Sequence, residues 1–228
     1  MKIIGVETSS TVFSLAVHED EQLLYELKRN RHAYAKSRDA GLFSAAKDLL
    51  DEFKPDQIKA LAISIGPGMF TSLRVGLSLV KGLALAHGIP TVAVNTLDII
   101  GIPLSYTEIP VLAVINAFHD EIYTADYERG GIIGDYELTT PGRVLEFTRG
   151  KRIIAGPGVE SFRKQGLMLN NKDLTFLDED FAMPSATKLV RIALPRIKAK
   201  KYDDIEVLEP FYIKKTDAER NYNKANAL

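Results

Sequence analysis

The sequence contains no cysteine, which excludes disulfide bonds, thiolate nucleophiles and cysteine metal ligands. Lack of cysteine is typical of cytosolic proteins, so we expect a cytoplasmic location. No apolar run approaches the ~20 residues needed to cross a bilayer, and the opening MKIIGVETSS has too short an apolar stretch for a signal peptide. The net charge of −1 argues against a strongly basic protein that binds nucleic acid by itself.

The usual catalytic signatures are also missing. The sequence has neither GxGxxG nor GxxxxGK[ST], the common nucleotide-binding motifs, and it has no GxSxG motif of serine hydrolases. None of the four histidines has a partner at the three- or four-residue spacing of a helical metal pair: His18, His32, His87 and His119. We expect His32 in a solvated loop, His87 at a helix end and His119 at a hairpin tip. The sequence therefore predicts no catalytic residue and no metal site.

The most informative segment of the chain runs from residue 60 to residue 90. An apolar run at residues 61–65 predicts a strand, Gly66-Pro67-Gly68 predicts a tight turn, and a long apolar pattern from about Thr71 to His87 predicts a helix. The first amides of this helix face the turn, where free N–H groups and the helix dipole can hold an anion.

This predicted helix is apolar nearly all round. One stripe comprises Leu73, Leu77, Val80 and Ala84. A second comprises Val75, Leu79, Gly82 and Ala86, and only Arg74, Ser78 and Lys81 form a polar seam. Such a helix must be covered on most sides. We expect one side to lie on its own sheet and another to contact a neighbouring helix or another protein.

The two halves of the chain share one order of predicted elements. In the first half we expect strands at 3–7, 12–18, 22–27, 61–65 and 92–94, with helices at 37–53 and 71–87. In the second half we expect strands at 111–115, 122–127, 134–139 and 152–155, a short helix near Val144, and a helix from about Val159 after Gly156-Pro157-Gly158. This predicts an α/β protein with two lobes, residues 1–104 and 105–228. In the polar tail, we expect an edge strand at 207–213.

A few polar residues could face a phosphate. Glu7, Thr8 and Ser9 follow the first strand, and a carboxylate beside small hydroxyl residues can meet a metal-bound phosphate. With Gly66 and Gly68 they form our candidate nucleotide-contacting set. The corresponding turn of the second half, Asn116-Ala117-Phe118, carries no carboxylate. The chain thus repeats a phosphate-facing arrangement without the charged residues to use it, which favours a scaffold without catalysis.

Several of these segments resemble the TsaB (YeaZ) family. The likeness rests on ETSS at 7–10, on GPGMFTSLRVGLSLVKGLA with the following GIP, on Asn116-Ala117 with Glu121-Ile122-Tyr123, and on EPFYIKKTDAE near the end. It extends from residue 1 to about residue 220. The resemblance implies the ASKHA fold of actin, Hsp70 and sugar kinases, in which two lobes each have the order β-β-β-α-β-α.

The resemblance also implies a function. TsaB-like proteins are non-catalytic partners of the larger paralogue TsaD, joined by the ATPase TsaE, in making N6-threonylcarbamoyladenosine at position 37 of tRNAs that read ANN codons. TsaD carries an HxxxH metal pair, whereas here TVAVNTLDII follows GIP without a histidine. The implied protein needs no cofactor of its own, binds ATP or ADP only weakly or at a partner interface, and meets tRNA through the complex.

Three differences from the family pattern indicate a distant branch. The usual Asp-Ala-Arg of the second half is Asn116-Ala117-Phe118, the first-strand acid is Glu7 rather than Asp, and HAYAKSRDAGLF replaces an HSE-type helix opening. These differences weaken the case for a nucleotide contact.

In the resembling proteins the first two helices form the docking face for TsaD, and this face also pairs with itself in a homodimer. Mapped onto this sequence, the expected anchors are Leu42, Phe43, Leu49, Leu73, Leu77 and Val80. The alternative is that these residues serve the internal core. Two other functions also stay open. One is a small ASKHA-type kinase or phosphotransferase, and the other is an M22-like peptidase.

Overall fold

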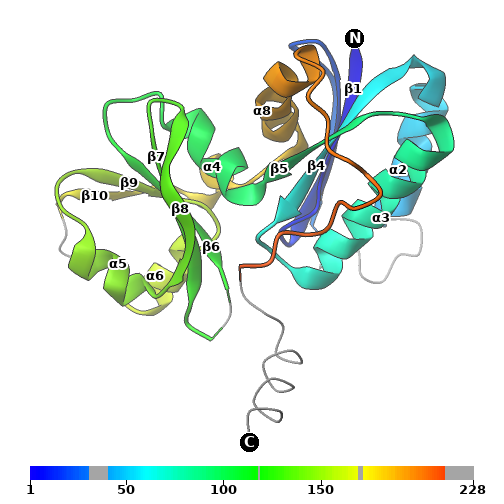
Figure 1. Ribbon diagram of the computed structural model, residues 1–228. Coiled ribbons are helices and arrows are strands. Elements are labelled where there is room, and N and C mark those ends of the chain that lie inside the picture. The colour runs from blue at the N-terminus through cyan, green and yellow to red at the C-terminus, as the bar shows by residue number, and fades with distance from the viewer. Residues whose placement is uncertain (31–40, 118, 169–171, 214–228) are drawn as a thin grey trace, which may run out of the picture.

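The computed structural model describes residues 1–30, 41–117, 119–168 and 172–213, which form two lobes, each built on a five-stranded sheet (Figure 1). The elements of the first sheet and its outer helices are β1 (Lys2–Glu7), β2 (Val12–Glu19), β3 (Gln22–Asn30), α2 (Leu42–Glu52), a 3₁₀ turn (Pro55–Gln57), β4 (Ile58–Gly66), α3 (Phe70–His87) and β5 (Thr91–Asn95). The first residues of the helix predicted at 37–53 lie outside the described residues, and the part that the structure describes is α2.

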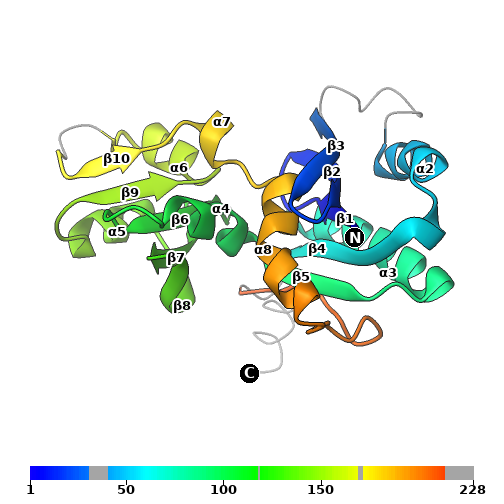
Figure 2. The same cartoon turned by 90° about the horizontal axis from the view of Figure 1, so that it is seen from above.

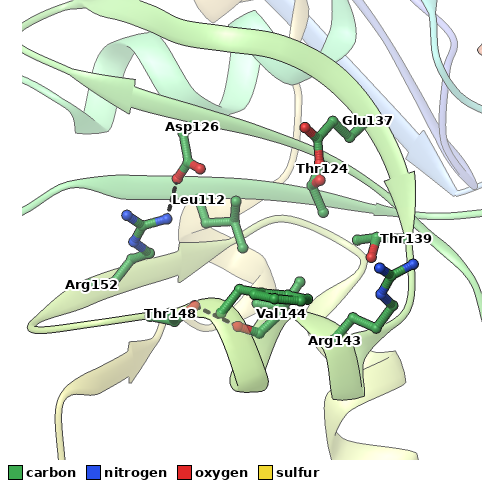
Figure 3. A pocket seen from close by; sticks show the side chains of 10 residues that line it. Leu112, Thr124, Asp126, Glu137, Thr139, Arg143, Val144, Thr148 and Arg152 are labelled. Carbon is green, nitrogen blue, oxygen red and sulfur yellow. Dashed lines mark hydrogen bonds and ion pairs between the residues drawn. The ribbon is translucent and has the colours of Figure 1, made fainter.

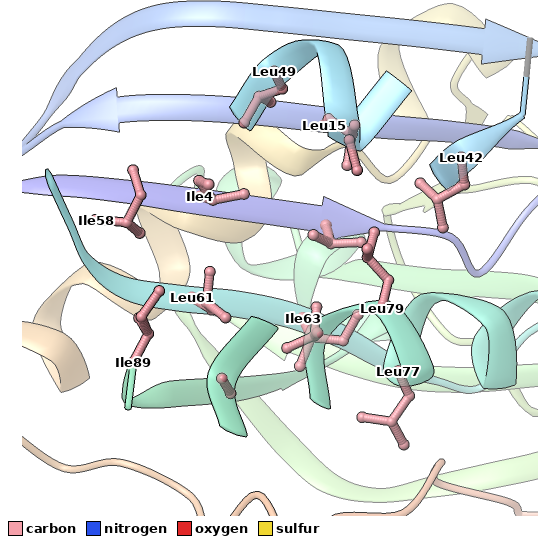
Figure 4. Close-up of a cluster of buried hydrophobic side chains, with 14 of the residues drawn as sticks. Ile4, Leu15, Leu42, Leu49, Ile58, Leu61, Ile63, Leu77, Leu79 and Ile89 are labelled. Carbon is pink, nitrogen blue, oxygen red and sulfur yellow. The ribbon is translucent and has the colours of Figure 1, made fainter. Parts of the chain in front are cut away.

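The first sheet has the order β3-β2-β1-β4-β5. The first three strands are antiparallel neighbours, whereas β4 and β5 run parallel to β1 because each returns through a crossover. Both α2 and α3 cover the outer face of this sheet, where their apolar sides meet strand residues such as Ile4, Leu15 and Ile63 (Figure 4). This buried cluster is the core of the first lobe.

The second lobe repeats this plan. Its elements are β6 (Val111–Asn116), β7 (Ile122–Glu128), β8 (Gly131–Thr139), α5 (Pro141–Phe147), β9 (Arg152–Ala155), α6 (Val159–Lys164) and β10 (Leu174–Phe176). The strand order β10-β9-β6-β7-β8 mirrors that of the first sheet. The shared topology agrees with the repeated element order read from the sequence. The hairpin turns at His119-Asp120 and Arg129-Gly130 have positive φ, as tight connections between strands require.

Two helices lie between the sheets (Figures 1 and 2). Helix α4 (Thr96–Leu104) begins at Asn95, whose side chain accepts a hydrogen bond from the Leu97 amide at 2.8 Å, and it packs on the second sheet. Helix α8 (Ala186–Lys198), preceded by the short α7 (Glu179–Ala182), packs on the inner face of the first sheet. Each inner face is therefore covered by a helix from the opposite half of the sequence.

The described tail corrects two of our predictions. The predicted edge strand at 207–213 is wrong, because this segment forms no ladder and only the Phe211 amide bonds to β4, at the Ile65 carbonyl (2.7 Å). We call residues 199–213 the C-terminal strap. Because α8 and the strap both pack on the first sheet and α3, the later part of the predicted 105–228 lobe lies with the first lobe. None of α4, β10, α7 and α8 was predicted from the sequence.

No helix within the described ranges is long and apolar enough to cross a membrane. The longest, α3, has a polar seam along its length, formed by Arg74, Ser78 and Lys81, all at least partly exposed.

Candidate functional site

The turn after β1 and the Gly66-Pro67-Gly68 turn, predicted separately from the sequence, lie against each other. The Met69 amide donates a 2.8 Å hydrogen bond to the Ser9 carbonyl. A Cβ on Gly68 would overlap that carbonyl, so only glycine permits this approach. Gly66 has φ +113°, a conformation that glycine alone adopts without strain. The sequence therefore brings the five candidate nucleotide-contacting residues into one place.

The carboxylate of Glu7 is held inside this junction. Its Oε1 accepts hydrogen bonds from the Ser9 amide (2.7 Å), from the Ser9 hydroxyl and from the Ser64 hydroxyl (3.2 Å). The Ser64 hydroxyl also accepts a bond from the Thr8 amide (3.2 Å). Several donors on one oxygen are the arrangement expected for a buried carboxylate. Here Glu7 organises the turn after β1.

Burial limits what this junction can do chemically. Glu7 and Thr8 are 0% exposed and Ser9 is 3% exposed, so their side chains do not reach solvent. In this arrangement the Glu7 carboxylate accepts hydrogen bonds within the turn and is buried from solvent. Contact of Glu7, Thr8, Ser9, Gly66 or Gly68 with a nucleotide stays a prediction.

The second lobe repeats the junction without the acid. Gly156 has φ +120°, and the Gly158 amide donates a 3.0 Å hydrogen bond to the Val114 carbonyl. The adjacent Asn116 is exposed at the end of β6. Phe118, the third residue of the segment that we compared with the Asp-Ala-Arg of the family pattern, lies outside the described residues.

The predicted docking anchors lie largely inside the protein. Five of the six are 7% exposed or less and belong to the chain's own core: Leu42, Leu49, Leu73, Leu77 and Val80. This burial favours the alternative that they serve the internal core, because each helix uses its strongest apolar stripe to cover its own sheet, and their role as docking anchors stays a prediction (Figure 4). Among the six, only Phe43 presents a largely exposed side chain, 57% accessible.

A small apolar gap of about 10 Å³ lies between α2 and α3. Its walls are formed by Ala46, Leu49 and Leu50 of α2 and by Leu79 and Leu83 of α3. Its floor is formed by the sheet residues Ile4, Val6 and Leu15, so every lining residue is apolar. Phe43 lies one helical turn before Ala46 and two before Leu50, on the same side of α2. We call the surface formed by Phe43, Ala46, Leu50, Leu79 and Leu83 the α2–α3 crevice.

The sequence offered a partial signal for this crevice. Leu79 belongs to the second apolar stripe recognised on the long helix, whereas Leu50 and Leu83 were not singled out as docking residues. Periodicity identified the stripes but could not assign one to the core and the other to the surface.

The other flank of α3 is covered by the C-terminal strap. Lys81 donates a 3.1 Å hydrogen bond to the Glu206 carbonyl, and Leu208 and Pro210 line the space beside Leu77. The strap thus occupies the side of α3 that faces away from the α2–α3 crevice.

Among the described residues, the histidines lie far from one another in the fold and gather with no cluster of acids. His18 is buried in β2, His87 is exposed at the end of α3 before the left-handed Gly88, and His119 is exposed at a hairpin tip. His32 lies outside the described residues. Within the part of the chain that the structure describes, no three His, Asp or Glu side chains form a group suited to a metal ion.

Two lobes with matching five-stranded sheets and the order β-β-β-α-β-α define the chain as an ASKHA-type α/β protein. A solved structure of YeaZ from Pseudomonas aeruginosa has this fold, with a TM-score of 0.74 and 26% identity over 93% of this chain and 99% of that one. A second Pseudomonas aeruginosa structure, described as similar to the peptidase YeaZ, gives a TM-score of 0.75.

Sequence comparisons give the family. Residues 40–222 match the family described as "TsaD: tRNA N6-adenosine threonylcarbamoyltransferase". The tRNA threonylcarbamoyladenosine biosynthesis protein TsaB of Escherichia coli is 27% identical over 94% of this chain and 95% of that protein. A tRNA N6-adenosine threonylcarbamoyltransferase of Dehalococcoides mccartyi is 34% identical, but over 42% of this chain and 34% of that protein. The chain belongs to the TsaD family and, within it, to the TsaB (YeaZ) proteins of tRNA threonylcarbamoyladenosine biosynthesis.

Proposed function

We propose that this chain is a non-catalytic subunit that docks a TsaD-like catalytic paralogue in the synthesis of N6-threonylcarbamoyladenosine at position 37 of tRNAs reading ANN codons. A TsaE-like ATPase joins the pair, and tRNA is reached through the complex. The observation that carries the proposal is Phe43, an aromatic side chain that is 57% exposed on α2, one of the helices that the family resemblance assigns to docking. The buried Glu7 supports it further, because that carboxylate is unavailable as a catalytic acid.

The outer surface of α2 and α3 suits a helix of a partner. It presents the half-buried side chains of Leu50 and Leu83 beside the exposed aromatic ring of Phe43. Exposed apolar side chains gathered in one place mark interaction surfaces, and aromatic residues are common among their strongest contacts. In the absence of the paralogue, a second copy of this chain occupies the same surface. ATP or ADP, where it binds, does so weakly or at the partner interface.

The proposal is tested by co-purification with the TsaD-like paralogue of the same genome. Phe43→Glu places a charge at the most exposed apolar side chain of the docking surface, and desolvating that charge opposes association. We expect the variant to bind the paralogue at least about 30-fold more weakly, which corresponds to an interface contact worth about 2 kcal/mol. Light scattering gives the mass of the complex, and isothermal titration calorimetry gives its dissociation constant.

Leu85→Glu is the matched control. Leu85 lies on the same helix as Leu83 and is 59% exposed, close to the 57% of Phe43. Two residues apart on a helix, Leu83 and Leu85 point about 160° apart, so Leu85 faces away from the crevice. We expect this variant to bind like the natural protein. Equal binding by Phe43→Glu and the natural chain, with circular dichroism showing both folded, would overturn docking through this surface.

The non-catalytic role needs its own measurement. Threonylcarbamoyladenosine in tRNA is quantified by nucleoside mass spectrometry after incubation with this chain alone, the paralogue alone, or both, each with the ATPase. We expect product only with both chains, and we expect Glu7→Gln to retain it because Glu7 serves the fold. Product formed by this chain without the paralogue would contradict the proposal.

A further inference from the structure

A cavity of about 290 Å³ opens on the outer face of the second lobe, between the sheet and α5 (Figure 3). It exists because short helices cover this face: α5 has 7 residues and α6 has 6, whereas α2 and α3 of the first lobe have 11 and 18. Its volume is close to the lower end for small-molecule sites, about 300 Å³. The cavity lies in a different lobe from the α2–α3 crevice, and the inference below is independent of the proposed docking.

The strand under this cavity is polar where its counterpart is apolar. On β2 of the first sheet, the residues that face the covering helices are Phe13, Leu15 and Val17. On β7 of the second sheet, the residues that face α5 and α6 are Ile122, Thr124 and Asp126. A polar substitution at a position that normally builds a core costs stability unless it is satisfied by partners. The loss of apolar side chains here creates a polar cavity on an otherwise hydrophobic face.

Four charged side chains from four elements line the cavity, two of each sign. Asp126 on β7 accepts an ion-pair hydrogen bond from Arg152 on β9. Burial raises the pKa of Asp126, and the charge of Arg152 opposes that change. The other two charges, Glu137 on β8 and Arg143 on α5, form no ion pair with any residue in the described ranges.

The two unpaired charges reach the cavity from opposite sides, with Glu137 on the sheet and Arg143 on the helix (Figure 3). The guanidinium of Arg143 also lies 5.7 Å from the ring centroid of Phe147, which forms an exposed aromatic edge. The floor between them is aliphatic, formed by Leu112 and Val144. One cationic wall, one anionic wall and an apolar floor match a ligand with one charge of each sign and a short aliphatic part.

We propose that this cavity binds a small zwitterion of the free α-amino-acid class. The ligand carboxylate pairs with Arg143, and its ammonium group pairs with Glu137. Its side chain lies over Leu112 and Val144, while the Thr124 hydroxyl supplies a hydrogen-bonding position nearby. Arginine suits the carboxylate because its guanidinium can donate two parallel hydrogen bonds. The Asp126–Arg152 pair holds β7 and β9 in place behind the site.

The test uses L-valine as the probe, with isothermal titration calorimetry on the full chain and amide chemical shifts in NMR to locate the site. Two analogues each lack one charge: isobutylamine lacks the carboxylate, and isovalerate lacks the ammonium group. We expect saturable binding of one L-valine per chain, shifts at Thr124, Glu137 and Arg143, and at least about tenfold weaker binding of either analogue. A tenfold change corresponds to about 1.4 kcal/mol for each lost charge pair.

Variants sharpen the assignment. Arg143→Gln and Glu137→Gln change exposed side chains, so we expect both to fold and each to weaken L-valine about tenfold. Arg149→Gln, at a nearby exposed arginine that does not line the cavity, serves as control and should bind normally. Absence of binding to the folded natural protein would overturn the proposal. Equal affinity for isovalerate, or shifts confined to other residues, would overturn the zwitterion assignment.

Discussion

Arg74 on α3 and Tyr212 in the C-terminal strap, 138 positions apart in the sequence, are joined by a 3.0 Å hydrogen bond from the guanidinium Nε to the phenol oxygen. The guanidinium carbon of Arg74 lies 5.8 Å from the centroid of the Tyr212 ring. The Tyr212 ring also contacts the ring of Phe70, with centroids 4.8 Å apart. Tyr212 therefore fastens the strap to the flank of α3 that faces away from the α2–α3 crevice.

Removing the Tyr212 side chain should loosen the strap. We expect Tyr212→Ala to lower the free energy of unfolding by about 1–2 kcal/mol, because the ring contact and the hydrogen bond are both lost. Tyr212→Phe keeps the ring contact and should cost about 0.5–1 kcal/mol. Urea unfolding followed by circular dichroism measures both. A Tyr212→Phe variant as unstable as Tyr212→Ala would show that the hydrogen bond, and not the ring, fastens the strap.

Local signals account for what the sequence predicted correctly. Strands β1, β2, β6 and β7 are short apolar runs bounded by turn residues, and the Gly-Pro-Gly turns mark both strand-to-helix junctions. These signals depend on a few neighbouring residues. The repeated order of elements then followed, and with it the two-lobed fold.

Tertiary placement accounts for what was missed. Helix α8 begins at Ser185, whose hydroxyl accepts a 3.3 Å hydrogen bond from the Lys188 amide, but Pro195 inside the helix interrupts the usual helical signal. The strap is extended without forming a ladder, because long-range contacts such as Tyr212 with Arg74 hold it instead. Only the packed structure shows that Leu77 and Leu79, from different stripes, are both buried while Phe43 stays exposed.

Two glycines of α3 make a matched pair with opposite expected effects. A Cβ on Gly76 would overlap the Thr8 hydroxyl, whereas a Cβ on Gly82 would meet nothing within 4 Å. We expect Gly76→Ala to lower the free energy of unfolding by about 1–2 kcal/mol, because overpacking outweighs the gain in helix propensity. Gly82→Ala should raise it by about 1 kcal/mol. Thermal and urea unfolding test the pair, and stabilisation by both substitutions would contradict the close contact of α3 with the turn after β1.

Side chains from α8 and the C-terminal strap complete the outer edge of β5 at Ala93. Its amide donates a 2.7 Å hydrogen bond to Asp203 Oδ2, and its carbonyl accepts a 2.9 Å bond from Arg196 Nη1. The Nη2 of Arg196 in turn donates to both oxygens of Asp203, at 2.9 and 3.0 Å. The three residues satisfy an edge that would otherwise offer free backbone groups to another strand.

Asp203→Ala should leave the Ala93 amide and the Arg196 guanidinium without this acceptor. We expect the free energy of unfolding to fall by about 1.5–2 kcal/mol. This value is at the lower end of the range for hydrogen bonds to charged groups, because the site is partly exposed to solvent. Asp203→Asn retains one oxygen for the amide and should lose less. Glu209→Ala, at an exposed acid elsewhere in the strap, should change stability by no more than about 0.5 kcal/mol. Equal effects of Asp203→Ala and Glu209→Ala in urea unfolding would show that the edge needs no acceptor.

His18 lies in β2, fully buried beneath α8. Burial lowers the pKa of its imidazole from the usual 6.5, the positive charge of Arg191 lowers this pKa further, and Glu26 acts in the opposite direction. The folded protein therefore favours the neutral ring. Above pH 6.5 the ring is neutral in both the folded and the unfolded chain, and its contribution to stability is fully present.

Below pH 6.5 the unfolded chain takes up a proton that the folded chain resists, so stability falls until the lowered pKa of the folded state is reached. Between pH 7.5 and pH 5.5 we expect the natural protein to lose up to about 1.4 kcal/mol more than His18→Leu, an upper bound set by the ordinary pKa of 6.5 in the unfolded chain. Urea unfolding at a series of pH values measures both. If His18→Leu folds but shows the same pH dependence as the natural protein, protonation of His18 does not limit stability in acid. Should the leucine variant fail to fold, His18→Gln, which is nearer to histidine in size and polarity, repeats the test.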